Sequence, residues 1–212
     1  MYLIFPNDPT TEFLQEVIDF TKEYYPQVRV VNCSASNESY AETLDILEAI
    51  PEGGTIFFIG HGSPNTLYGG ASNGIEKKSL ITLKNVNLFK HSQLILMACN
   101  SSDFIKSSRP MRHFSDGLGF GLLPSEIIEL QKNRKIRELK LSEEELNKFK
   151  VILISLFKNI IAKVANGEKC MERLAFFVST YLSKSINELI ADENASKIAK
   201  LLFYIKKDIT SG

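Results

Sequence analysis

Two residues of the sequence, His61 and Cys99, could act together in nucleophilic catalysis. Each follows a short run of large apolar residues: TIFFI stands before Gly60-His61-Gly62, and QLILMA stands directly before Cys99. The thiolate is the reactive form of cysteine, and an imidazole beside the sulfur favours that form and can accept its proton. If the two side chains meet in the folded chain, they supply a nucleophile and its base.

The two apolar runs are the elements that must position these side chains. Short continuous apolar runs bounded by polar residues or glycine are typical of strands buried on both faces of a parallel sheet. Ligands of such sheets bind outside the carboxyl ends of neighbouring strands. We therefore predict that His61 and Cys99 lie side by side at one rim of the sheet, beside an open groove. The backbone N–H groups of Gly62 and Cys99 could form an oxyanion hole there.

The surrounding segments predict an α/β fold. Extended runs alternate with amphipathic helical patterns up to the His61 strand, which is typical of a mostly parallel sheet. The extended runs cover residues 2–5, 28–33 and 55–59. Helical patterns return beyond residue 140, at residues 141–165, 170–190 and 195–209. For one more strand after Cys99, the candidates are residues 119–123 and 126–130, and neither has a convincing strand pattern.

Two stretches carry a resemblance to a known family. GHGSPNTLYGG (residues 60–70) and SLITLKNVNLFKHSQLILMACNSS (residues 79–102) resemble the caspase-like (clan CD) cysteine peptidases, most closely the CHAT branch. The helix-Asn-Gly-helix pattern at residues 149–181 resembles the pair of long helices that follows the cysteine in CHAT proteins. The resemblance implies a caspase-like three-layer sandwich with a mostly parallel central sheet in residues 1–130. Residues 131–212 would be a helical C-terminal part that packs on this core or extends it.

The resemblance also implies an activity. It is that of a cysteine endopeptidase, a hydrolase that cleaves protein substrates with His61 and Cys99 as a dyad and without a cofactor. The histidine of the family is often oriented by a backbone carbonyl, so no aspartate is assigned to that role. Asp8, Asp103 and Asp116 are candidates for a substrate-binding carboxylate that would favour a basic P1 residue. Relatives are commonly switched on by a sensor, which implies a regulatory protein partner or an activating cleavage, in bacterial antiviral defence or regulated cell death.

Composition excludes several other functions. Lysine plus arginine equal aspartate plus glutamate at 25 each, and this neutral balance makes nucleic acid an improbable partner. The three cysteines, at positions 33, 99 and 170, form no CxxC pair, which favours a reducing compartment. No signal-peptide pattern or membrane-spanning run is present, so we expect a cytoplasmic protein without a membrane partner. Histidines and cysteines show no metal-ligand spacing, and no metal site is expected.

Two alternatives to a peptidase remain open. The first is a catalytically inert scaffold of the same fold, in which His61 and Cys99 persist but the cleft is closed and the strand after the cysteine is lost. The second is a nucleic-acid-binding module that uses the basic stretch at residues 132–140, KNRKIRELK. A basic stretch of this kind is more simply interpreted as a solvent-exposed helix face or a linker.

Overall fold

A six-stranded sheet forms the centre of the protein, in a computed structural model that describes residues 1–72, 74–134, 136–191 and 195–212. The strand order is β2-β1-β3-β7-β8-β9; the first five strands are parallel, and β9 is antiparallel to β8. The strands are β1 (Tyr2–Pro6), β2 (Arg29–Cys33), β3 (Thr55–Gly60), β7 (Ser92–Ala98), β8 (Phe114–Gly119) and β9 (Thr210–Ser211). The predicted mostly parallel α/β sheet is confirmed.

A small antiparallel sheet, β4-β5-β6, follows the histidine. Its strands are β4 (Gly62–Ser63), β5 (Thr66–Tyr68) and β6 (Ser79–Thr82). The hairpin of β4 and β5 starts directly after His61, because Gly62 is already paired with Leu67. This pairing fixes the direction in which the chain leaves the rim of the central sheet.

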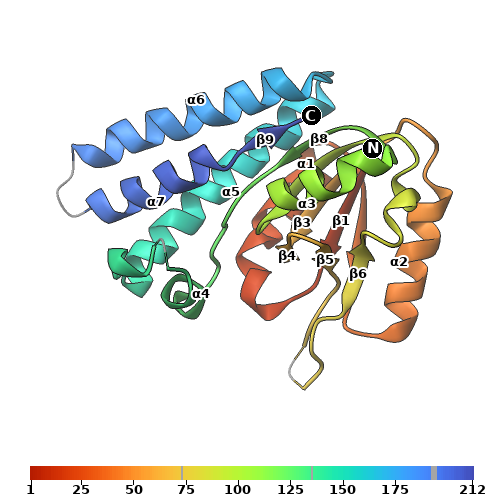
Figure 1. The fold of residues 1–212 in the computed structure, drawn as a ribbon, viewed down its shortest axis with the longest axis horizontal. Coiled ribbons are helices and arrows are strands. Elements are labelled where there is room, and N and C mark those ends of the chain that lie inside the picture. The colour runs from red at the N-terminus through yellow and green to blue at the C-terminus, as the bar shows by residue number, and fades with distance from the viewer. Residues whose placement is uncertain (73, 135, 192–194) are drawn as a thin grey trace.

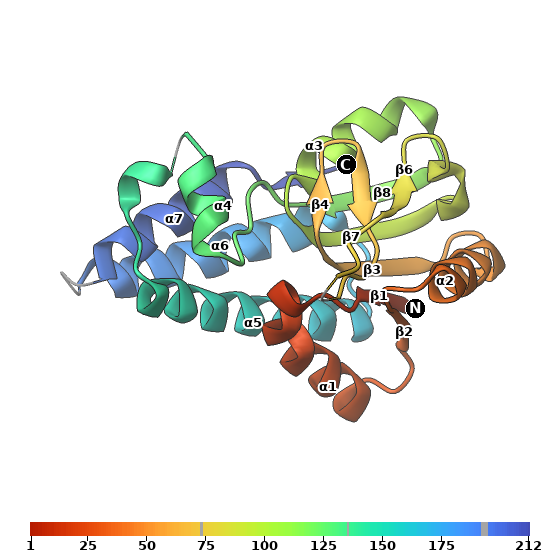
Figure 2. The ribbon, with the colours of Figure 1, turned by 90° about the horizontal axis from the view of Figure 1, so that it is seen from below.

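Helices cover both faces of the central sheet and complete three layers (Figures 1 and 2). Against one face lie α1 and α5, and against the other lie α2 and α3, while α6 and α7 pack beside α5 (Figure 1). The α-helices are α1 (Gln15–Tyr24), α2 (Asn37–Ala49), α3 (Ser101–Ser108), α4 (Ile127–Lys132), α5 (Glu143–Ala165), α6 (Met171–Ile190) and α7 (Ser196–Lys207). The 3-10 helices are η1 (Pro9–Leu14), η2 (Val86–Phe89), η3 (Arg109–Met111) and η4 (Arg137–Leu139).

The alternation of side chains along the buried strands produces two cores. Phe57, Ile59 and Met97 belong to the cluster that includes α1, α5, α6 and α7. Phe58, Leu96 and Ala98 belong to the cluster on the α2 and α3 side. The C-terminal helices therefore share one continuous hydrophobic core with the sheet.

The strand after the cysteine exists, but neither predicted candidate supplies it. Residues 114–119, FSDGLG, form β8 and pair in parallel with β7. Two glycines and an aspartate weaken the strand pattern of this segment, yet the space beside β7 admits it: a Cβ on Gly119 would lie 2.7 Å from the backbone of Ser101 and Ser102. Residues 126–130 instead enter α4, and most of residues 119–123 lie beyond the strand.

The long C-terminal helices agree with the sequence patterns within a few residues. A capping box at Ser142 and Glu145 starts α5, as the Ser-Glu-Glu-Glu sequence predicts. Among the residues described here, no helix combines the length and apolar character that crossing a bilayer requires.

Candidate active site

The register of β3 and β7 brings His61 and Cys99 to the same rim. The last paired residues are Gly60 and Ala98, and the histidine and the cysteine come immediately after them. Neighbouring strands lie about 4.8 Å apart. Cys99 belongs to the hydrophobic cluster on the α1 and α5 side, and His61 lines a cavity together with Phe157 of α5. The predicted adjacency of the two strands is confirmed, and both residues lie on the same side of the sheet.

Gly62 lies directly against the cysteine segment. A Cβ at this position would lie 2.6 Å from the carbonyl oxygen of Cys99 and 3.1 Å from the Cβ of Ala98. The Tyr68 N–H donates to the His61 carbonyl, with an N–O distance of 3.1 Å. In an antiparallel ladder, a bond in this position flanks a non-hydrogen-bonded pair, which here is Gly62 and Leu67. The N–H of Gly62 therefore points away from β5 and is not used by it.

Replacing Gly62 with alanine is expected to destabilise the protein by about 1–3 kcal/mol, because the new methyl group would press on backbone that cannot rotate away. Urea unfolding of the variant measures this loss. Gly60→Ala is the comparison on the other side of the histidine, where the nearest atoms are ring carbons of Pro6 at 3.2 and 3.3 Å. A Gly62→Ala protein as stable as the wild type would show that the two segments do not pack so closely.

The ring of His61 is held by two residues that follow β1. Its Nε2 lies 2.6 Å from Thr10 Oγ1 and 3.5 Å from Asp8 Oδ2. Thr10 in turn donates to Asp8 Oδ1 from its hydroxyl, at 2.7 Å, and from its backbone N–H, at 2.9 Å. Asp8 caps η1, so the capping interaction also fixes the carboxylate beside the histidine. All three side chains lie at the carboxyl ends of β1 and β3.

Burial and nearby charges favour a neutral imidazole and an ionised Asp8. Burial and the charge of Lys77 lower the pKa of His61 below its ordinary value, against the opposing effect of Asp8, Glu129 and Glu126. Burial raises the pKa of Asp8, but the hydrogen bonds from Thr10, with the charges of His61 and Lys77, lower it overall. The Lys77 ammonium lies 4.0 Å from Asp8 Oδ2.

This environment predicts acid sensitivity. Because the pKa of His61 is lowered below 6.5 in the folded state, the unfolded chain binds more protons as the pH falls below about 6.5, and the free energy of unfolding decreases. The urea midpoint at about pH 5, relative to pH 7, should therefore fall more in the wild type than in His61→Gln, which does not titrate there. Equal losses in the two proteins would contradict the lowered pKa.

The thiol of Cys99 is closed off. Its Sγ lies 3.0 Å from the Leu123 carbonyl oxygen and 3.1 Å from the Leu123 nitrogen. Burial and the charge of Glu129 raise the pKa of Cys99 to about 12, although the Leu123 N–H acts in the opposite direction. At neutral pH the sulfur is therefore a thiol and not the reactive thiolate.

Residues 120–125, here named the covering segment, lie over the sulfur and are firmly attached. Phe120 and Gly121 accept hydrogen bonds from the N–H groups of Ser102 and Asn100, at 2.8 and 2.7 Å. At the other end, the Glu129 carboxylate accepts from the N–H of Ser125, at 2.7 Å, and from its hydroxyl, at 3.2 Å. Hydrogen bonds thus hold one end of the segment to the turn after Cys99 and the other end to α4.

The cavity that His61 lines is not the open groove predicted from the sequence. The cavity beside His61 has a volume of only about 20 Å³, and its walls include Leu123 and Ser125. This space suits about one water molecule and not a peptide. The remaining walls come from η1, β3, β7 and α5, at Thr11, Phe13, Leu14, Gly60, Met97, Leu153 and Phe157.

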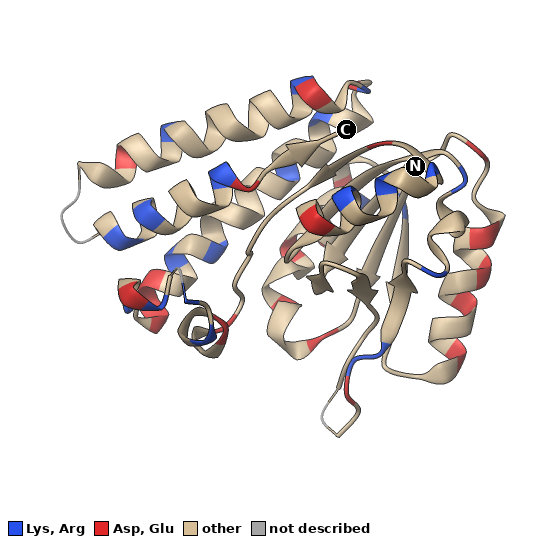
Figure 3. Ribbon diagram, viewed as in Figure 1, with Lys and Arg blue, Asp and Glu red and all other residues tan. Residues whose placement is uncertain are grey.

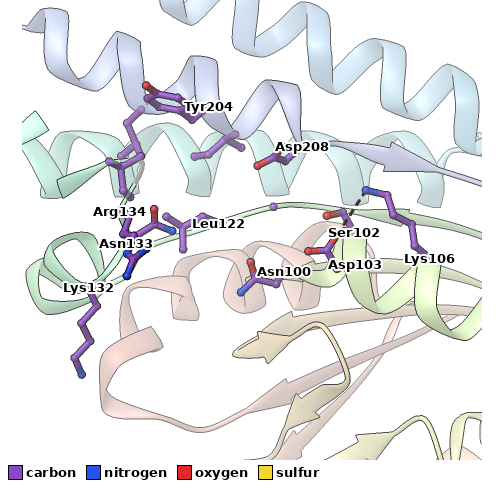
Figure 4. A pocket seen from close by; sticks show the side chains of 14 residues that line it. Asn100, Ser102, Asp103, Lys106, Leu122, Lys132, Asn133, Arg134, Tyr204 and Asp208 are labelled. Carbon is purple, nitrogen blue, oxygen red and sulfur yellow. Dashed lines mark ion pairs between the residues drawn. The ribbon is translucent and has the colours of Figure 1, made fainter. Parts of the chain in front are cut away.

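A larger cavity of about 470 Å³ lies beside the covering segment (Figure 4). Leu122 lines it, whereas the next residue, Leu123, contacts the thiol. Asp103 of α3 and Asp208 at the end of α7 both contribute carboxylates, and Asp103 is paired with Lys106 at 3.6 Å. Lysine and arginine side chains also line this cavity, at Lys106, Lys132 and Arg134.

The three aspartates predicted to bind substrate lie in different places. Asp103 lines the larger cavity, four positions after Cys99. Asp8 is instead engaged by His61, Thr10 and Lys77. Asp116 pairs with Gln93, at the opposite end of β7, six residues before Cys99 and about 20 Å from it along the strand. That position removes Asp116 from the candidate substrate pocket.

Several residues of the site carried no recognisable sequence signal. Thr10 and Leu123 are ordinary residues of a helix start and a connecting segment, and Asp208 lies 109 positions after Cys99 in the sequence. Asp8 alone had a signal, because an aspartate before Pro-Thr-Thr at the end of a strand is typical of a helix cap. Among the described residues, no group of histidine, cysteine and carboxylate side chains could hold a metal ion.

The basic stretch at residues 132–140 does not form a separate basic face. It spans the end of α4 and η4, and acidic residues of the neighbouring segments lie beside the cations in this part of the molecule (Figure 3). Arg137 is paired with Glu138 at 3.3 Å, and Lys132 and Arg134 line the larger cavity. Lys135, also part of this stretch, lies outside the described residues.

The geometry defines a three-layer α/β protein in which a histidine and a cysteine follow adjacent parallel strands. Compared with models of known protein families and with curated proteins, the sequence matches none of them.

Proposed function

We propose that this protein is a caspase-like cysteine endopeptidase of the CHAT type in a closed, inactive conformation. The observation that carries the proposal is the pair of parallel strands β3 and β7, which end in His61 and Cys99 at one rim and on one side of the sheet. The buried carboxylate network behind the histidine adds support, because a general base needs a fixed orientation.

In the open protein, Cys99 would transfer its thiol proton to His61, and the thiolate would attack the scissile carbonyl carbon. The new C–S bond moves the carbonyl electron pair onto oxygen, where the N–H groups of Gly62 and Cys99 stabilise it. When the C–N bond breaks, the leaving amine takes the proton from His61. Water then hydrolyses the thioester, with His61 as base, and regenerates the thiol.

Activation in this proposal requires displacement of the covering segment. Moving Leu123 would free the sulfur and join the rim to the larger cavity that Leu122 lines. A regulatory protein or a cleavage could supply the necessary energy, as the family resemblance implies. A role in bacterial defence rests on that resemblance alone.

Substrate choice would be made in the larger cavity, which begins at Asn100, the residue after the nucleophile. Asp103 and Asp208 give it carboxylates for a basic P1 side chain, beside the cations of Lys106, Lys132 and Arg134. The ion pair of Asp103 with Lys106 is exposed and therefore weak, so it could be exchanged for a substrate contact. Gly121 allows Asp208 to approach, because a Cβ at this glycine would lie 2.3 Å from the Asp208 Cβ.

Labelling with a peptidyl chloromethyl ketone, followed by mass spectrometry of the modified peptide, tests the proposed function. We expect modification at Cys99 once mild urea loosens the covering segment, and labelling on the order of 10²-fold slower in His61→Gln. The half-buried Cys170 serves as an internal reference. Modification of Cys170 alone, with none at Cys99 up to the onset of global unfolding, would contradict a peptidase.

The alternative is an inert scaffold of the same fold. The burial of Cys99 and its raised pKa of about 12 favour it, because a structural thiol has these properties. The preserved strand β8 and the oriented histidine favour the peptidase instead. The labelling experiment separates the two functions. In an inert scaffold, the labelling rate of Cys99 should be the same in the wild type and in His61→Gln.

A further inference from the structure

The hydroxyl of Thr10 stands between a buried carboxylate and the imidazole of His61. Its oxygen is 2.7 Å from Asp8 Oδ1 and 2.6 Å from His61 Nε2. The side chain of Asp8 is only 5 % exposed and that of His61 only 9 %. Water therefore has little access to these groups, and the three side chains must satisfy one another.

Counting protons fixes the direction of each bond. A threonine hydroxyl has one proton, and an ionised carboxylate can only accept. Thr10 therefore donates its proton to Asp8, and its oxygen accepts from the Nε2–H of His61. In a neutral imidazole only one ring nitrogen carries a proton, so Nδ1 keeps its lone pair. Within the described residues, Nδ1 has no hydrogen-bond partner that would compete for this lone pair.

We propose that Asp8 and Thr10 are positioning residues that hold His61 as the Nε2–H tautomer and leave Nδ1 as the basic nitrogen. The role of Nδ1 as the catalytic base rests on the proposed function, whereas the tautomer itself does not. Asp8 is then not a substrate-binding residue. Its carboxylate stabilises the imidazolium that forms when His61 takes the thiol proton, and Thr10 transmits this effect through the hydroxyl.

Other charged groups near the ring do not replace this arrangement. Lys77 lies 4.0 Å from Asp8 Oδ2, the same oxygen that lies 3.5 Å from His61 Nε2, and its charge disfavours protonation of His61. Glu126 and Glu129 act on His61 through their charges and favour protonation, but neither makes a hydrogen bond to the ring. Among the described residues, Thr10 Oγ1 and Asp8 Oδ2 are thus the groups that distinguish between the two ring nitrogens, because both contact Nε2.

Nitrogen-15 NMR of the histidine rings in the full chain tests the proposal directly, because protonated and unprotonated ring nitrogens differ in chemical shift. We expect the Nε2–H tautomer for His61 in the wild type and in Thr10→Ser. Thr10→Val should populate the other tautomer. Thr11→Val is the matched control: it removes a neighbouring hydroxyl that donates to the Asp8 backbone carbonyl and not to the ring. Asp8→Asn should keep the tautomer and lower the pKa of His61.

An Nδ1–H tautomer in the wild type, or a Thr10→Val protein with an unchanged tautomer, would overturn the proposal. If Thr10→Val does not fold, the wild-type tautomer and the Asp8→Asn titration still decide it. The measurement needs no substrate, so it is independent of the peptidase activity. A correct tautomer together with no labelling of Cys99 would sustain the assignment of the ring nitrogens and reject the peptidase. If the peptidase holds, Thr10→Val should lower kcat by roughly 10²-fold and Thr10→Ser should restore it.

Discussion

Replacement of Cys99 by alanine is expected to abolish peptide cleavage by the activated protein, with a loss of at least about 10⁴-fold in kcat. Removal of the nucleophile leaves only binding and the oxyanion hole, neither of which can form the thioester intermediate. The fold should persist, because the side chain loses only one buried sulfur and its contacts with the Leu123 backbone. A peptide-library cleavage profile of both proteins measures the loss and gives the P1 preference.

Cys170→Ala is the matched control for this experiment. Cys170 lies at the start of α6, half-buried, far along the chain from the rim. It should retain full activity. Undiminished cleavage by Cys99→Ala would show that the activity belongs to another group or to a contaminant, and the assignment of the nucleophile would fail.

Glu129→Ala is expected to increase the reactivity of Cys99 toward thiol reagents. The Glu129 carboxylate accepts hydrogen bonds from the N–H and hydroxyl of Ser125 and from the N–H of Glu126, and its charge also raises the pKa of Cys99. Its removal loosens the covering segment and makes ionisation of the thiol more favourable. Both effects act in the same direction.

The size of this effect follows from the two limiting pKa values. With a pKa of about 12, roughly one thiol in 10⁴ is ionised at pH 8, whereas about a quarter is ionised at the exposed-cysteine value of about 8.5. Complete opening would therefore raise the labelling rate by about 10³-fold, and we expect at least about 10-fold for Glu129→Ala. The rate of modification at Cys99 between about pH 7 and pH 9 measures it.

Glu138→Ala controls for the loss of one carboxylate near the same helices. Glu138 is exposed and paired with Arg137 at 3.3 Å. It should leave the labelling rate of Cys99 unchanged. If Glu129→Ala and Glu138→Ala react at the same slow rate as the wild type, the covering segment is not the barrier to reactivity, and the inert scaffold becomes the better description.

The proposal explains the closed site as an inactive form, in which the thiol is covered while the histidine is already oriented. In the described conformation, the Leu123 backbone contacts the sulfur, and burial with the charge of Glu129 keeps Cys99 in its thiol form. His61 is nevertheless held ready by Asp8 and Thr10, whose contacts do not involve the covering segment. The proposed base is thus held by contacts that do not involve the covering segment, and in the proposal a displacement of residues 120–125 exposes the proposed nucleophile.

The sequence by itself determined the elements that depend on local pattern. The runs before His61 and Cys99 are strands because short continuous apolar segments are typical of strands that are buried on both faces. The capping signal at Ser142 likewise fixed the start of α5. These features follow from nearest neighbours along the chain, and so they can be inferred without coordinates.

Only the tertiary structure decided how the site is arranged and that it is closed. Thr10 meets His61 across 51 positions, Leu123 covers Cys99 across 24, and β8 forms from a glycine-rich segment because β7 offers it a paired edge. None of these contacts has a periodicity or a motif of its own. Each depends on which distant backbone segments the packed core brings to the same rim, and that is settled by the balance of burial over the whole chain rather than by any local pattern.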